Sequence, residues 1–479
     1  MNTFAHALSA INSPPPALTA NGMTTNAESG SALLDLFFIL GASRGQDISE
    51  KFMKAWNENS MLAIKSLFWA RDVRGGAGER DTFRKLMQVV ETYSPHSVLR
   101  VLPLISEYGR WDDLHVFSTA EIQSAAIKLH AQAIQAGNGL AAKWAPRKGA
   151  IANALRKHLG MDPKTYRKTI VALTTVVETQ MCAKQWDQIN YTHVPSVAGA
   201  RYQKAFTKHD AVRYSEFKTA AVKGEVKINA GTLYPYDVLK SVAHGDATAA
   251  LAQWQVLPNY LGDAGFMLPV IDTSGSMGSR VGGKNSTLTC MDVAISLGLY
   301  LADKQTGPFK DMFLNFHTHS KIHHLKGNLL EKISQIQRSD WGGSTNLESA
   351  FKEILKVAVL GDVPEAEMPR YLLVISDMGF DACEQGHNPT AFDMAKEMFS
   401  RHGYTLPTIV WWNVAHKPGG YGGDNNSPVK RDDVNTVMIS GFSPSIMKNV
   451  LNAKSVTPYD VMMDTINNER YAAVEAALS

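Results

Sequence analysis

The stretch VIDTSGSMGSR, from Val270 to Arg280, decides the fold of the C-terminal half of the chain. Together with the preceding GFMLP it supplies an apolar run, Phe266 to Ile271, that is typical of a strand buried on both faces. One acid and a run of hydroxyls and glycines follow this strand directly. We therefore expect Asp272, Ser274 and Ser276 at the point where the strand ends.

After Pro258, strand patterns alternate with helical patterns. Strands are predicted at Phe266–Ile271, Met312–His317, Lys321–Leu325, Tyr371–Ser376, Thr408–Val414 and Val434–Ser440. Helices are predicted at Thr289–Asp303, Thr345–Leu360, Thr390–His402, Ser443–Leu451 and Tyr459–Leu478. This alternation is typical of a doubly wound, Rossmann-like α/β sheet, which binds ligands at the carboxyl ends of its strands.

The first half of the chain has a different pattern. Residues 1–30 are rich in Ser, Thr, Pro, Asn and Ala and are predicted to form a flexible arm. From Ser31 onward, stretches such as SALLDLFFIL and AEIQSAAIKLHAQAIQA place apolar residues at helical spacing. Short successive helices without strands favour HEAT-like repeats. We predict the fold class α + α/β, with a helical-repeat domain at residues 31–257 and an α/β domain at residues 258–479.

The composition indicates an ordinary globular protein. Apolar residues make up 44% of the chain and charged residues 19%. No apolar run reaches the roughly 18 residues that a membrane helix needs, and the N-terminus lacks the pattern of a signal peptide. The three cysteines are far apart and odd in number, which fits a reducing compartment. We expect a cytoplasmic protein without a membrane partner.

Positive charge is concentrated in one segment. Between Leu140 and Lys240 there are 17 Lys and Arg residues and seven Asp and Glu residues, whereas the net charge of the whole chain is only +3. Such a segment favours a polyanionic partner, and the interleaved rings of Trp144 and Tyr166 favour RNA. A solvated basic face is the alternative. The candidate RNA-binding residues are Lys143, Arg147, Lys148, Arg156, Lys157, Arg167 and Lys168.

Three segments carry oxygen ligands to the predicted sheet edge. Asp272, Ser274 and Ser276 lie on the first loop, Thr345 lies in WGGSTNLESAF, and Asp377 directly follows the strand in YLLVISDMGFD. Carboxylates and hydroxyls without soft or nitrogen ligands are what an octahedral Mg²⁺ site accepts. These five residues are therefore the candidate metal ligands.

This pattern resembles the metal-ion-dependent adhesion site, or MIDAS, of von Willebrand factor A domains, over about residues 265–452. The resemblance implies that Ser274 and Ser276 bind the ion directly and that Thr345 does so in some states. It also implies that Asp272 and Asp377 act directly or through water. In that family a sixth position accepts a carboxylate or another group from a partner. The implied role is partner binding that depends on Mg²⁺, Mn²⁺ or Ca²⁺.

Other interpretations explain fewer of these residues. The acid and serines of the first loop would also suit a helix cap or a turn, but capping leaves Thr345 and Asp377 unexplained. A phosphatase-type Asp-x-Asp loop would need an acid where Ser274 stands, and no G-x-S-x-G motif surrounds Ser274 or Ser276. We therefore do not expect an enzyme.

The histidines of NFHTHSKIHHL have two interpretations. His317 and His319 could bind zinc together with His323 or His324. A solvated hairpin is the alternative, because no Cys or carboxylate completes a ligand set nearby.

The motif LFWARDVRGGAGERDTF, Leu67 to Phe83, is also open to two interpretations. Its arginines and glycine-rich turn could present guanidinium groups and backbone amides to phosphate. Alternatively, Arg71 with Asp72 and Glu79 with Arg80 could form internal ion pairs that hold a helix-helix turn.

Several motifs resemble an uncharacterised family of the DUF2828 type, which pairs a helical domain with a C-terminal von Willebrand A domain. They are ARDVRGGAGERD, GRWDDL, KWAPRKG, QWDQINYTHVPSVAGARYQKAFTKHDAVRYSEFK and KGEVKINAGTLYPYDVL. In plan this family is related to the Ro 60 kDa autoantigen, whose TROVE domain is a ring of helical repeats. That ring binds single-stranded RNA ends and small structured RNAs.

The resemblance implies an RNA-binding protein of a ribonucleoprotein, with a divalent metal site for structural or partner-binding use. RNA binding follows here from architecture and charge. The alternative is a metal-dependent protein-protein adaptor or scaffold that binds an acidic protein ligand and no nucleic acid.

Overall fold

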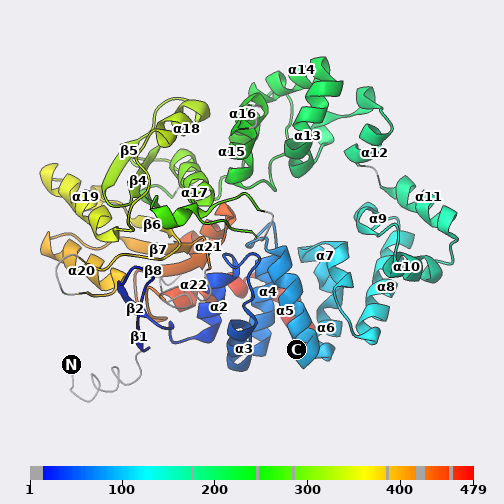
Figure 1. Ribbon diagram of the computed structural model, residues 1–479, viewed down its shortest axis with the longest axis horizontal. Helices are drawn as coiled ribbons and strands as arrows, with labels where there is room; N and C mark the ends of the chain where they lie inside the picture. Colours follow the sequence, from blue (N-terminus) through cyan, green and yellow to red (C-terminus); the bar gives the residue numbers. More distant parts are fainter. Residues whose placement is uncertain are drawn as a thin grey trace. The chain divides into compact units, whose positions relative to one another are not determined.

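The computed structural model describes residues 14–174, 176–243, 247–262, 264–282, 286–383, 388–416, 427–452 and 457–479. These residues form two compact units (Figure 1). Unit 1 contains the described residues up to Ser66, together with Gly75–Thr82 and Asn259–Asn468. Unit 2 contains Leu67–Arg74, Phe83–Pro258 and Glu469–Ser479.

Within the described residues, unit 1 contains a six-stranded sheet with the strand order β5-β4-β3-β6-β7-β8. Its strands are β3 (Met267–Asp272), β4 (Met312–Phe316), β5 (Ser320–His324), β6 (Tyr371–Ser376), β7 (Thr408–Asn413) and β8 (Thr436–Ser440). Only the β4–β5 pair is antiparallel among these described strands. The chain leaves β3 toward β4 on one side and reaches β6 on the other, so a topological switch point lies between β3 and β6.

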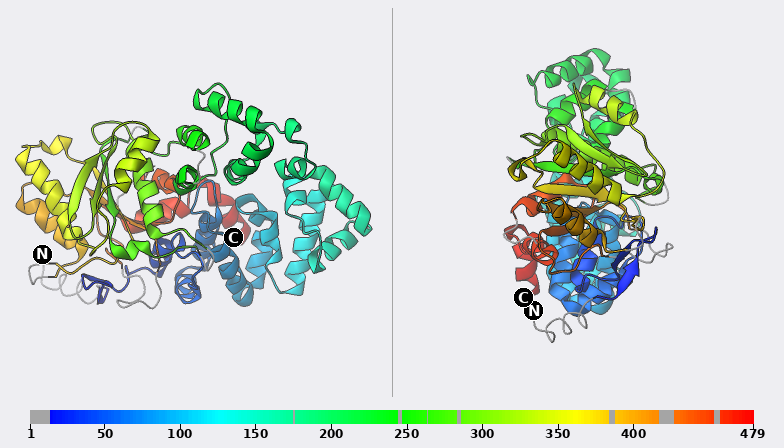
Figure 2. Two further views of the ribbon diagram at one scale, coloured as in Figure 1. Left: turned by 45° about the horizontal axis from the view of Figure 1, so that its top comes forward. Right: turned by 90° about the vertical axis from the view of Figure 1, so that its left-hand side faces the viewer.

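Helices pack on both faces of this sheet. Helix α17 (Cys290–Lys304) contacts β3, β4 and β6, whereas α19 (Leu347–Leu360) contacts β4 and β5 and also α20 (Ala391–Arg401). Helices α17 and α19 lie on opposite faces, as right-handed crossovers in opposite directions require (Figure 2). Gly298 allows the close approach of α17, because an added Cβ would overlap the side chain of Ile271.

The N-terminal residues belong to unit 1. Residues 1–13 of the predicted flexible arm lie outside the described residues. The rest of that arm is ordered and includes the antiparallel strands β1 (Pro16–Leu18) and β2 (Thr24–Asn26). Backbone hydrogen bonds hold this β1–β2 hairpin on unit 1, including one from Met23 to Phe380 and a pair between Asn26 and Ser427. The polar stretch that was predicted to be a flexible arm instead forms hydrogen bonds with backbone groups of the α/β unit.

Helix α2 (Ala32–Leu40) belongs to unit 1 and packs against β8 of the sheet. Seven of its nine residues are buried, so the helix is apolar nearly all round and needs cover on most sides. The Oγ of Ser440 in β8 donates to the carbonyl of Phe37 at 3.0 Å and accepts from the N–H of Gly41 at 3.0 Å. The structure thus divides the chain differently from the predicted domains at 31–257 and 258–479, although the change of unit at Pro258 coincides with the predicted boundary.

Further helices complete unit 1 and connect it to unit 2. They are α3 (Ser49–Glu58), α18 (Leu329–Gln337), α21 (Met447–Asn452) and α22 (Pro458–Ile466). Helix α4 (Ser60–Arg71) begins in unit 1 and ends in unit 2, and α5 (Arg80–Tyr93) begins in a unit 1 segment.

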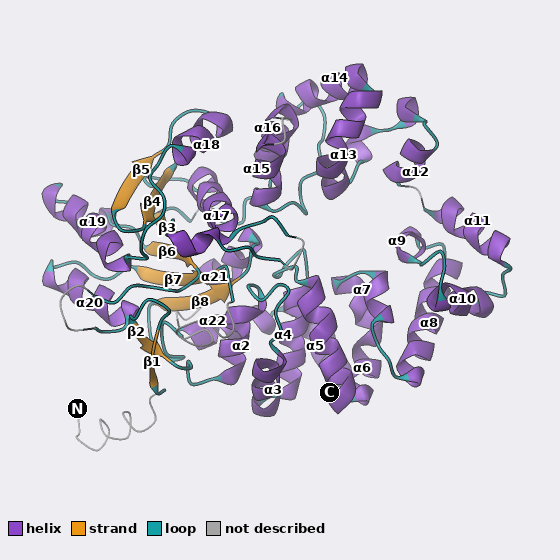
Figure 3. Ribbon diagram, in the orientation of Figure 1, coloured by secondary structure: helices purple, strands orange, loops and turns teal. Residues whose placement is uncertain are grey.

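Within the described residues, unit 2 is built from helices and loops, and the strands are confined to unit 1 (Figure 3). After α5 the helices are α6 (Pro95–Val101), α7 (Ile105–Tyr108), α8 (Ala120–Gln135), α9 (Gly139–Trp144), α10 (Ala150–His158), α11 (Pro163–Leu173), α12 (Val177–Cys182), α13 (Ser196–His209), α14 (Ala211–Val222), α15 (Pro235–Ala243) and α16 (Ala247–Gln255). Separate apolar clusters support α8 to α11 and α12 to α14. Packing in this unit is therefore mostly between neighbours in the chain.

The C-terminal segment departs from the single helix predicted at Tyr459–Leu478. It forms α22 in unit 1 and α23 (Ala472–Leu478) in unit 2. Tyr471 is buried in unit 2, where its hydroxyl donates to Asp72 at 3.2 Å and its ring stacks on Tyr108. Helix α22 ends at Ile466, and Tyr471 directly precedes α23.

The α/β pattern of the sequence is confirmed in outline. Each predicted strand is present, with its ends shifted by up to two residues. Helix α18 was not predicted. None of the described helices has the length and hydrophobicity needed to cross a membrane.

Candidate functional site

The carboxyl end of β3 carries the first part of the predicted metal site. Asp272 is the last residue of β3 and is 0% exposed. Its Oδ1 accepts a hydrogen bond from the backbone N–H of Ser274 at 2.9 Å, and its Oδ2 accepts one from the Oγ of Ser376 at 2.5 Å. The hydroxyl oxygens of Ser274 and Ser276 lie 3.2 Å apart. The strand end thus presents one buried carboxylate and two neighbouring hydroxyls.

The loop before α19 carries Thr345, which is 1% exposed. Two backbone hydrogen bonds tie this loop to the loop after β3. The N–H of Gly342 donates to the carbonyl of Thr273 at 2.8 Å, and the N–H of Gly275 donates to the carbonyl of Gly343 at 3.1 Å. Gly342 and Gly343 have φ angles of 102° and 81°, which favour glycine. The glycine pair therefore allows the turn that brings the two loops together.

Asp377 directly follows β6, the neighbour of β3. Its Oδ1 accepts a hydrogen bond from the N–H of Gly379 at 3.3 Å. Burial, followed by repulsion from Asp377, raises the pKa of Asp272 to about 7, although hydrogen bonds from Ser376 and Ser274 act in the opposite direction. The two carboxylates therefore lie close enough to repel each other, and a bound cation would offset that repulsion.

The donor set of this edge suits a hard cation. Two carboxylates and three hydroxyls offer only oxygen, which Mg²⁺ prefers, and water would complete the coordination. Among the described residues, no three His, Cys, Asp or Glu side chains are grouped so that they could hold one metal ion. A cation here would accordingly depend on hydroxyl and water ligands beside Asp272 and Asp377. The candidate ligands remain Asp272, Ser274, Ser276, Thr345 and Asp377.

The N-terminal hairpin supplies a residue that the sequence did not point to. The Nδ2 of Asn21 donates to the carbonyl of Gly379 at 2.7 Å and to the Oγ1 of Thr345 at 3.3 Å. Nearby, the hydroxyl of Thr19 donates to the carbonyl of Phe380 at 2.5 Å. The hairpin therefore lies against two of the three loops of the candidate metal site. No local pattern identified Asn21, because its contacts are more than 320 residues away in the chain.

The histidine cluster does not form the zinc site that one interpretation allowed. The Nε2 of His323 is hydrogen-bonded to the Oδ1 of Asn315 at 2.8 Å, and its ring stacks on Phe313. His317 and His319 lie beyond the end of β4, with ring centroids 6.2 Å apart. In the described part of the chain no metal-binding group of three such residues includes them.

In unit 2, four of the predicted RNA-binding residues surround one pocket of about 550 Å³ between α10 and α11. These are Arg147, Lys148, Arg156 and Arg167, and no carboxylate is among the described residues that line this α10–α11 pocket. The nearby carboxylate of Asp162 already caps α11 by accepting the N–H groups of Lys164 and Thr165. The pocket is therefore strongly electropositive.

Arg156 adds a polar atom that needs a partner. Its Nη1 donates to the carbonyl of Met161 at 3.3 Å, whereas its buried Nε has no hydrogen-bond partner among the described residues. A buried donor without a partner costs about 1–3 kcal/mol.

The remaining predicted RNA-binding residues are not gathered there. Lys157 and Lys168 are exposed on α10 and α11 outside the pocket, and Lys143 lies 5.8 Å from the ring centroid of Trp144. The expected aromatic platforms are also largely occupied. Tyr166 is only 2% exposed and packs in the α8–α11 core, and the guanidinium of Arg110 covers Trp144 at 3.6 Å from its centroid.

The arginine-rich motifs near residues 71 and 110 form a buried ion-pair network. Asp113, with a fully buried side chain, accepts from Arg71 at 2.8 Å and from Arg84 at 2.5 Å. Burial alone would raise the pKa of Asp112, but hydrogen bonds from Arg110 and Arg84 lower it to about 2. The structural interpretation of this motif is therefore supported for these residues.

The partners in this network differ from the predicted pairs. Arg71 pairs with Asp113 and not with Asp72, whose carboxylate accepts from Arg470 at 2.8 Å. Glu79 pairs with Arg44 at 2.5 Å and not with Arg80. Neither predicted pair forms, because chain folding brings Arg71 to Asp113 and Glu79 to Arg44.

The fold and site define a two-part protein, with one helical unit and one α/β unit that has polar residues at its topological switch point. Residues 19–117 and 151–266 match a domain of unknown function, DUF2828, and residues 267–477 match a second one, DUF7788.

A similar protein occurs in a giant virus. The chain is 28% identical to the uncharacterized protein L728 of Acanthamoeba polyphaga mimivirus, in an alignment that covers 94% of this chain and 86% of the viral protein. Together with the two domain matches, this similarity supports an uncharacterised family, of the DUF2828 type that the sequence motifs indicated.

Proposed function

We propose that this protein binds RNA through the basic surface of unit 2 and that unit 1 holds a divalent cation at its strand ends. The observation that carries the proposal is the α10–α11 pocket. Four of the cationic residues that the sequence marked as RNA-binding candidates line this pocket. No carboxylate is among the described residues of its lining. Phosphate groups are the natural ligands of such a surface.

The proposed architecture is Ro-like, with a HEAT-like TROVE-type helical domain and a von Willebrand A domain. Local packing of successive helices in unit 2 supports the first part. A mostly parallel sheet with Asp272 and Asp377 at its switch point supports the second. The cation would be structural or would bind a partner, and the proposed role is binding without catalysis.

The test is RNA binding by a charge-reversal variant and a control of equal net charge. The triple variant Arg147→Glu, Lys148→Glu and Arg167→Glu changes exposed side chains of the α10–α11 pocket. The control changes three exposed lysines outside that pocket: Lys184→Glu, Lys223→Glu and Lys227→Glu. Binding of labelled single-stranded and structured RNA is measured at about 50 mM salt, where phosphate contacts are strong.

We expect RNA affinity to fall at least tenfold in the pocket variant and less than threefold in the control. Equal affinity of the wild type and the pocket variant would contradict the proposal, as would a wild type that binds neither RNA.

A second candidate function is a metal-dependent protein adaptor, which the site at the strand ends favours. In that case a protein ligand would supply a carboxylate to the cation held by Asp272 and its neighbours. EDTA separates the two functions, because it should abolish capture of such a ligand and leave RNA binding by the α10–α11 pocket largely intact.

A further inference from the structure

A larger pocket in unit 2 is lined by residues that the sequence analysis did not single out. It lies between α13, α14 and α15 and has a volume of about 730 Å³, within the range of small-ligand sites. Its charged lining residues are Arg201, Lys204, Lys208, Lys218, Lys240 and Asp237. Five cations thus face one carboxylate in this α13–α15 pocket.

Three of these cations are arranged along one helix face. Arg201, Lys204 and Lys208 of α13 follow the spacing i, i+3 and i+7, which places them on the same side of a helix. All three are exposed, and none forms an ion pair with a carboxylate of the described residues. The one acid of the lining, Asp237, already accepts the backbone N–H of Tyr234 at 3.0 Å. With five cationic side chains and one carboxylate, the lining has a formal net charge of +4.

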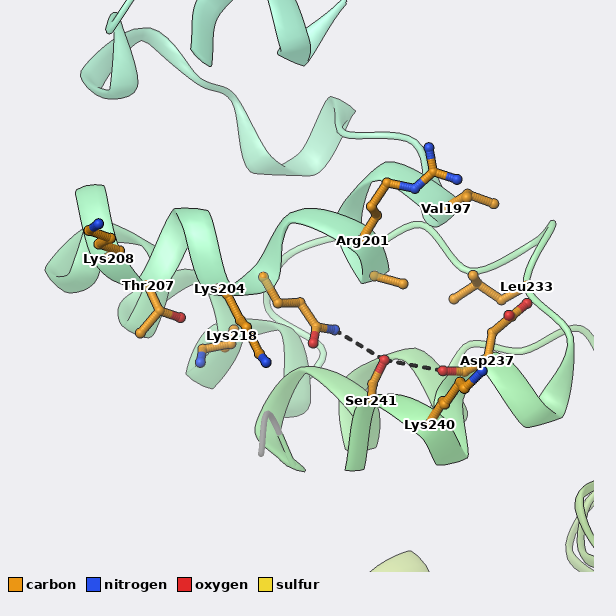
Figure 4. A pocket seen from close by; sticks show the side chains of 12 residues that line it. Val197, Arg201, Lys204, Thr207, Lys208, Lys218, Leu233, Asp237, Lys240 and Ser241 are labelled. Carbon is orange, nitrogen blue, oxygen red and sulfur yellow. Dashed lines mark hydrogen bonds between the residues drawn. The ribbon is translucent and has the colours of Figure 1, made fainter. Parts of the chain in front are cut away.

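The two ends of the α13–α15 pocket differ in character. Figure 4 shows Lys204, Lys208 and Lys218 toward one end, and Val197 and Leu233 toward the other, where Arg201, Asp237 and Lys240 also lie. Val197 is 45% exposed and gives this end of the pocket some apolar surface. A ligand that matches this lining has several negative charges near Lys204, Lys208 and Lys218 and a less charged part that contacts Val197 and Leu233.

The floor of the pocket supplies fixed polar groups. The Nε2 of Gln203 donates to the Oγ of Ser241 at 3.4 Å, and that hydroxyl donates to the carbonyl of Asp237 at 3.2 Å. Both Gln203 and Ser241 are buried. These bonds hold the amide of Gln203 in place in the lining of the pocket.

We propose that the α13–α15 pocket binds a nucleoside that carries adjacent phosphates. A triphosphate has about four negative charges at neutral pH, which matches the excess of positive charge in the lining. Val197 and Leu233 would contact the base or the ribose. Two ligands share this chemistry: a free nucleoside triphosphate and the 5′-triphosphate end of an RNA chain. This inference goes beyond the proposed function, because it stands whether or not the α10–α11 pocket binds RNA.

The test compares three probes by equilibrium titration: ATP, a short RNA with a 5′-triphosphate, and the same RNA with a 5′-hydroxyl. All titrations contain EDTA, so that ATP cannot be held by a cation at the strand ends of unit 1. The variant is Arg201→Glu, Lys204→Glu and Lys208→Glu, and the control is again Lys184→Glu, Lys223→Glu and Lys227→Glu. Because all six side chains are exposed, folding of both variants is expected and is checked by circular dichroism.

We expect the wild type and the control to bind a triphosphate probe at least tenfold more tightly than the pocket variant. Binding of ATP identifies a free nucleotide as a ligand, whereas binding of the 5′-triphosphate RNA alone identifies an RNA end. The inference is overturned if neither triphosphate probe binds or if the pocket variant binds these probes with the affinity of the wild type. It is also overturned if the variant loses as much affinity for the 5′-hydroxyl RNA as for the 5′-triphosphate RNA. The variant Arg147→Glu, Lys148→Glu and Arg167→Glu should retain ATP binding, which keeps the two pockets distinguishable.

Discussion

Asn21 donates a hydrogen bond from its Nδ2 to the Oγ1 of Thr345 at 3.3 Å, and so joins the N-terminal hairpin to the candidate metal site. The same amide donates to the carbonyl of Gly379 at 2.7 Å. The N-terminal hairpin thus lies against two loops of the candidate metal site. The hydrogen bond to Thr345 occupies one of the two lone pairs of this hydroxyl oxygen and so competes with a cation for it.

We therefore predict that Asn21→Ala raises the affinity for Mn²⁺ by about two- to tenfold, since the lost competition corresponds to one hydrogen bond of about 0.5–1.5 kcal/mol. The measurement is an Mn²⁺ titration followed by electron paramagnetic resonance. Unchanged or weaker Mn²⁺ binding would show that the hairpin does not compete with the cation.

Removing a candidate ligand should abolish cation binding. Asp272→Asn keeps the shape of the buried side chain and removes its charge, so we expect the affinity for Mn²⁺ to fall at least tenfold. The matched control is Asp432→Asn, because that carboxylate is 83% exposed and lies outside the site. Equal Mn²⁺ affinity of the Asp272 variant and the control would exclude Asp272 as a ligand.

The ion-pair network of unit 2 predicts a large effect on stability. Asp113→Ala leaves the guanidinium groups of Arg71 and Arg84 without their shared carboxylate, and breaking a buried pair in this way costs about 3–5 kcal/mol. Asp81→Ala removes an exposed pair with Arg80 and should cost less than about 1 kcal/mol. Urea denaturation of both variants checks the contrast, and similar losses would contradict the assignment of a buried network.

A histidine pair in unit 2 predicts how stability depends on pH. The ring nitrogens His115 Nε2 and His130 Nδ1 lie 2.7 Å apart, and His130 Nε2 lies 2.9 Å from the carbonyl oxygen of Ala141. Burial, followed by the charge of His130, lowers the pKa of His115 from 6.5 to about 4, although Asp112 acts in the opposite direction. On acidification, His115 therefore becomes protonated at a lower pH in the folded state than in the unfolded state.

The pKa of His115 is lower in the folded state than in the unfolded state. The neutral His115 side chain therefore makes its full contribution to stability above pH 6.5, and this contribution is lost as the pH falls toward 4. In His115→Gln, the free energy of unfolding should vary less between pH 4 and 6.5, by about 1–3 kcal/mol. Denaturation curves at several pH values measure this difference. An identical pH dependence in the wild type and the variant would mean that His115 titrates normally in the folded protein.

The sequence predicted the parts of the fold that depend on local patterns. The buried strand before Asp272 and the one before Asp377 each have a continuous apolar run, and their polar exits follow directly. Arg147 and Arg156, which line the α10–α11 pocket, were chosen as candidate RNA-binding residues by charge density, which also depends only on neighbouring residues.

What the sequence did not predict depends on contacts between distant segments. Asn21 lies in a polar stretch that resembled a flexible arm, and its partners are more than 320 residues away. Arg71 has an acid next to it at position 72, yet it pairs with Asp113, 42 residues further on. Tyr166 was expected to be a stacking platform, but its helical spacing places it in the core, where it is 2% exposed.

The salt dependence of RNA binding tests the central claim most directly. The wild type and the variant Arg147→Glu, Lys148→Glu and Arg167→Glu are titrated with the same single-stranded RNA at several salt concentrations between about 50 and 200 mM. Each phosphate contact contributes about 0.7 to the slope of log K against log salt, so the variant should lose about two units of slope. A parallel slope in both proteins, or no RNA binding at the lowest salt, would contradict RNA binding by the α10–α11 pocket.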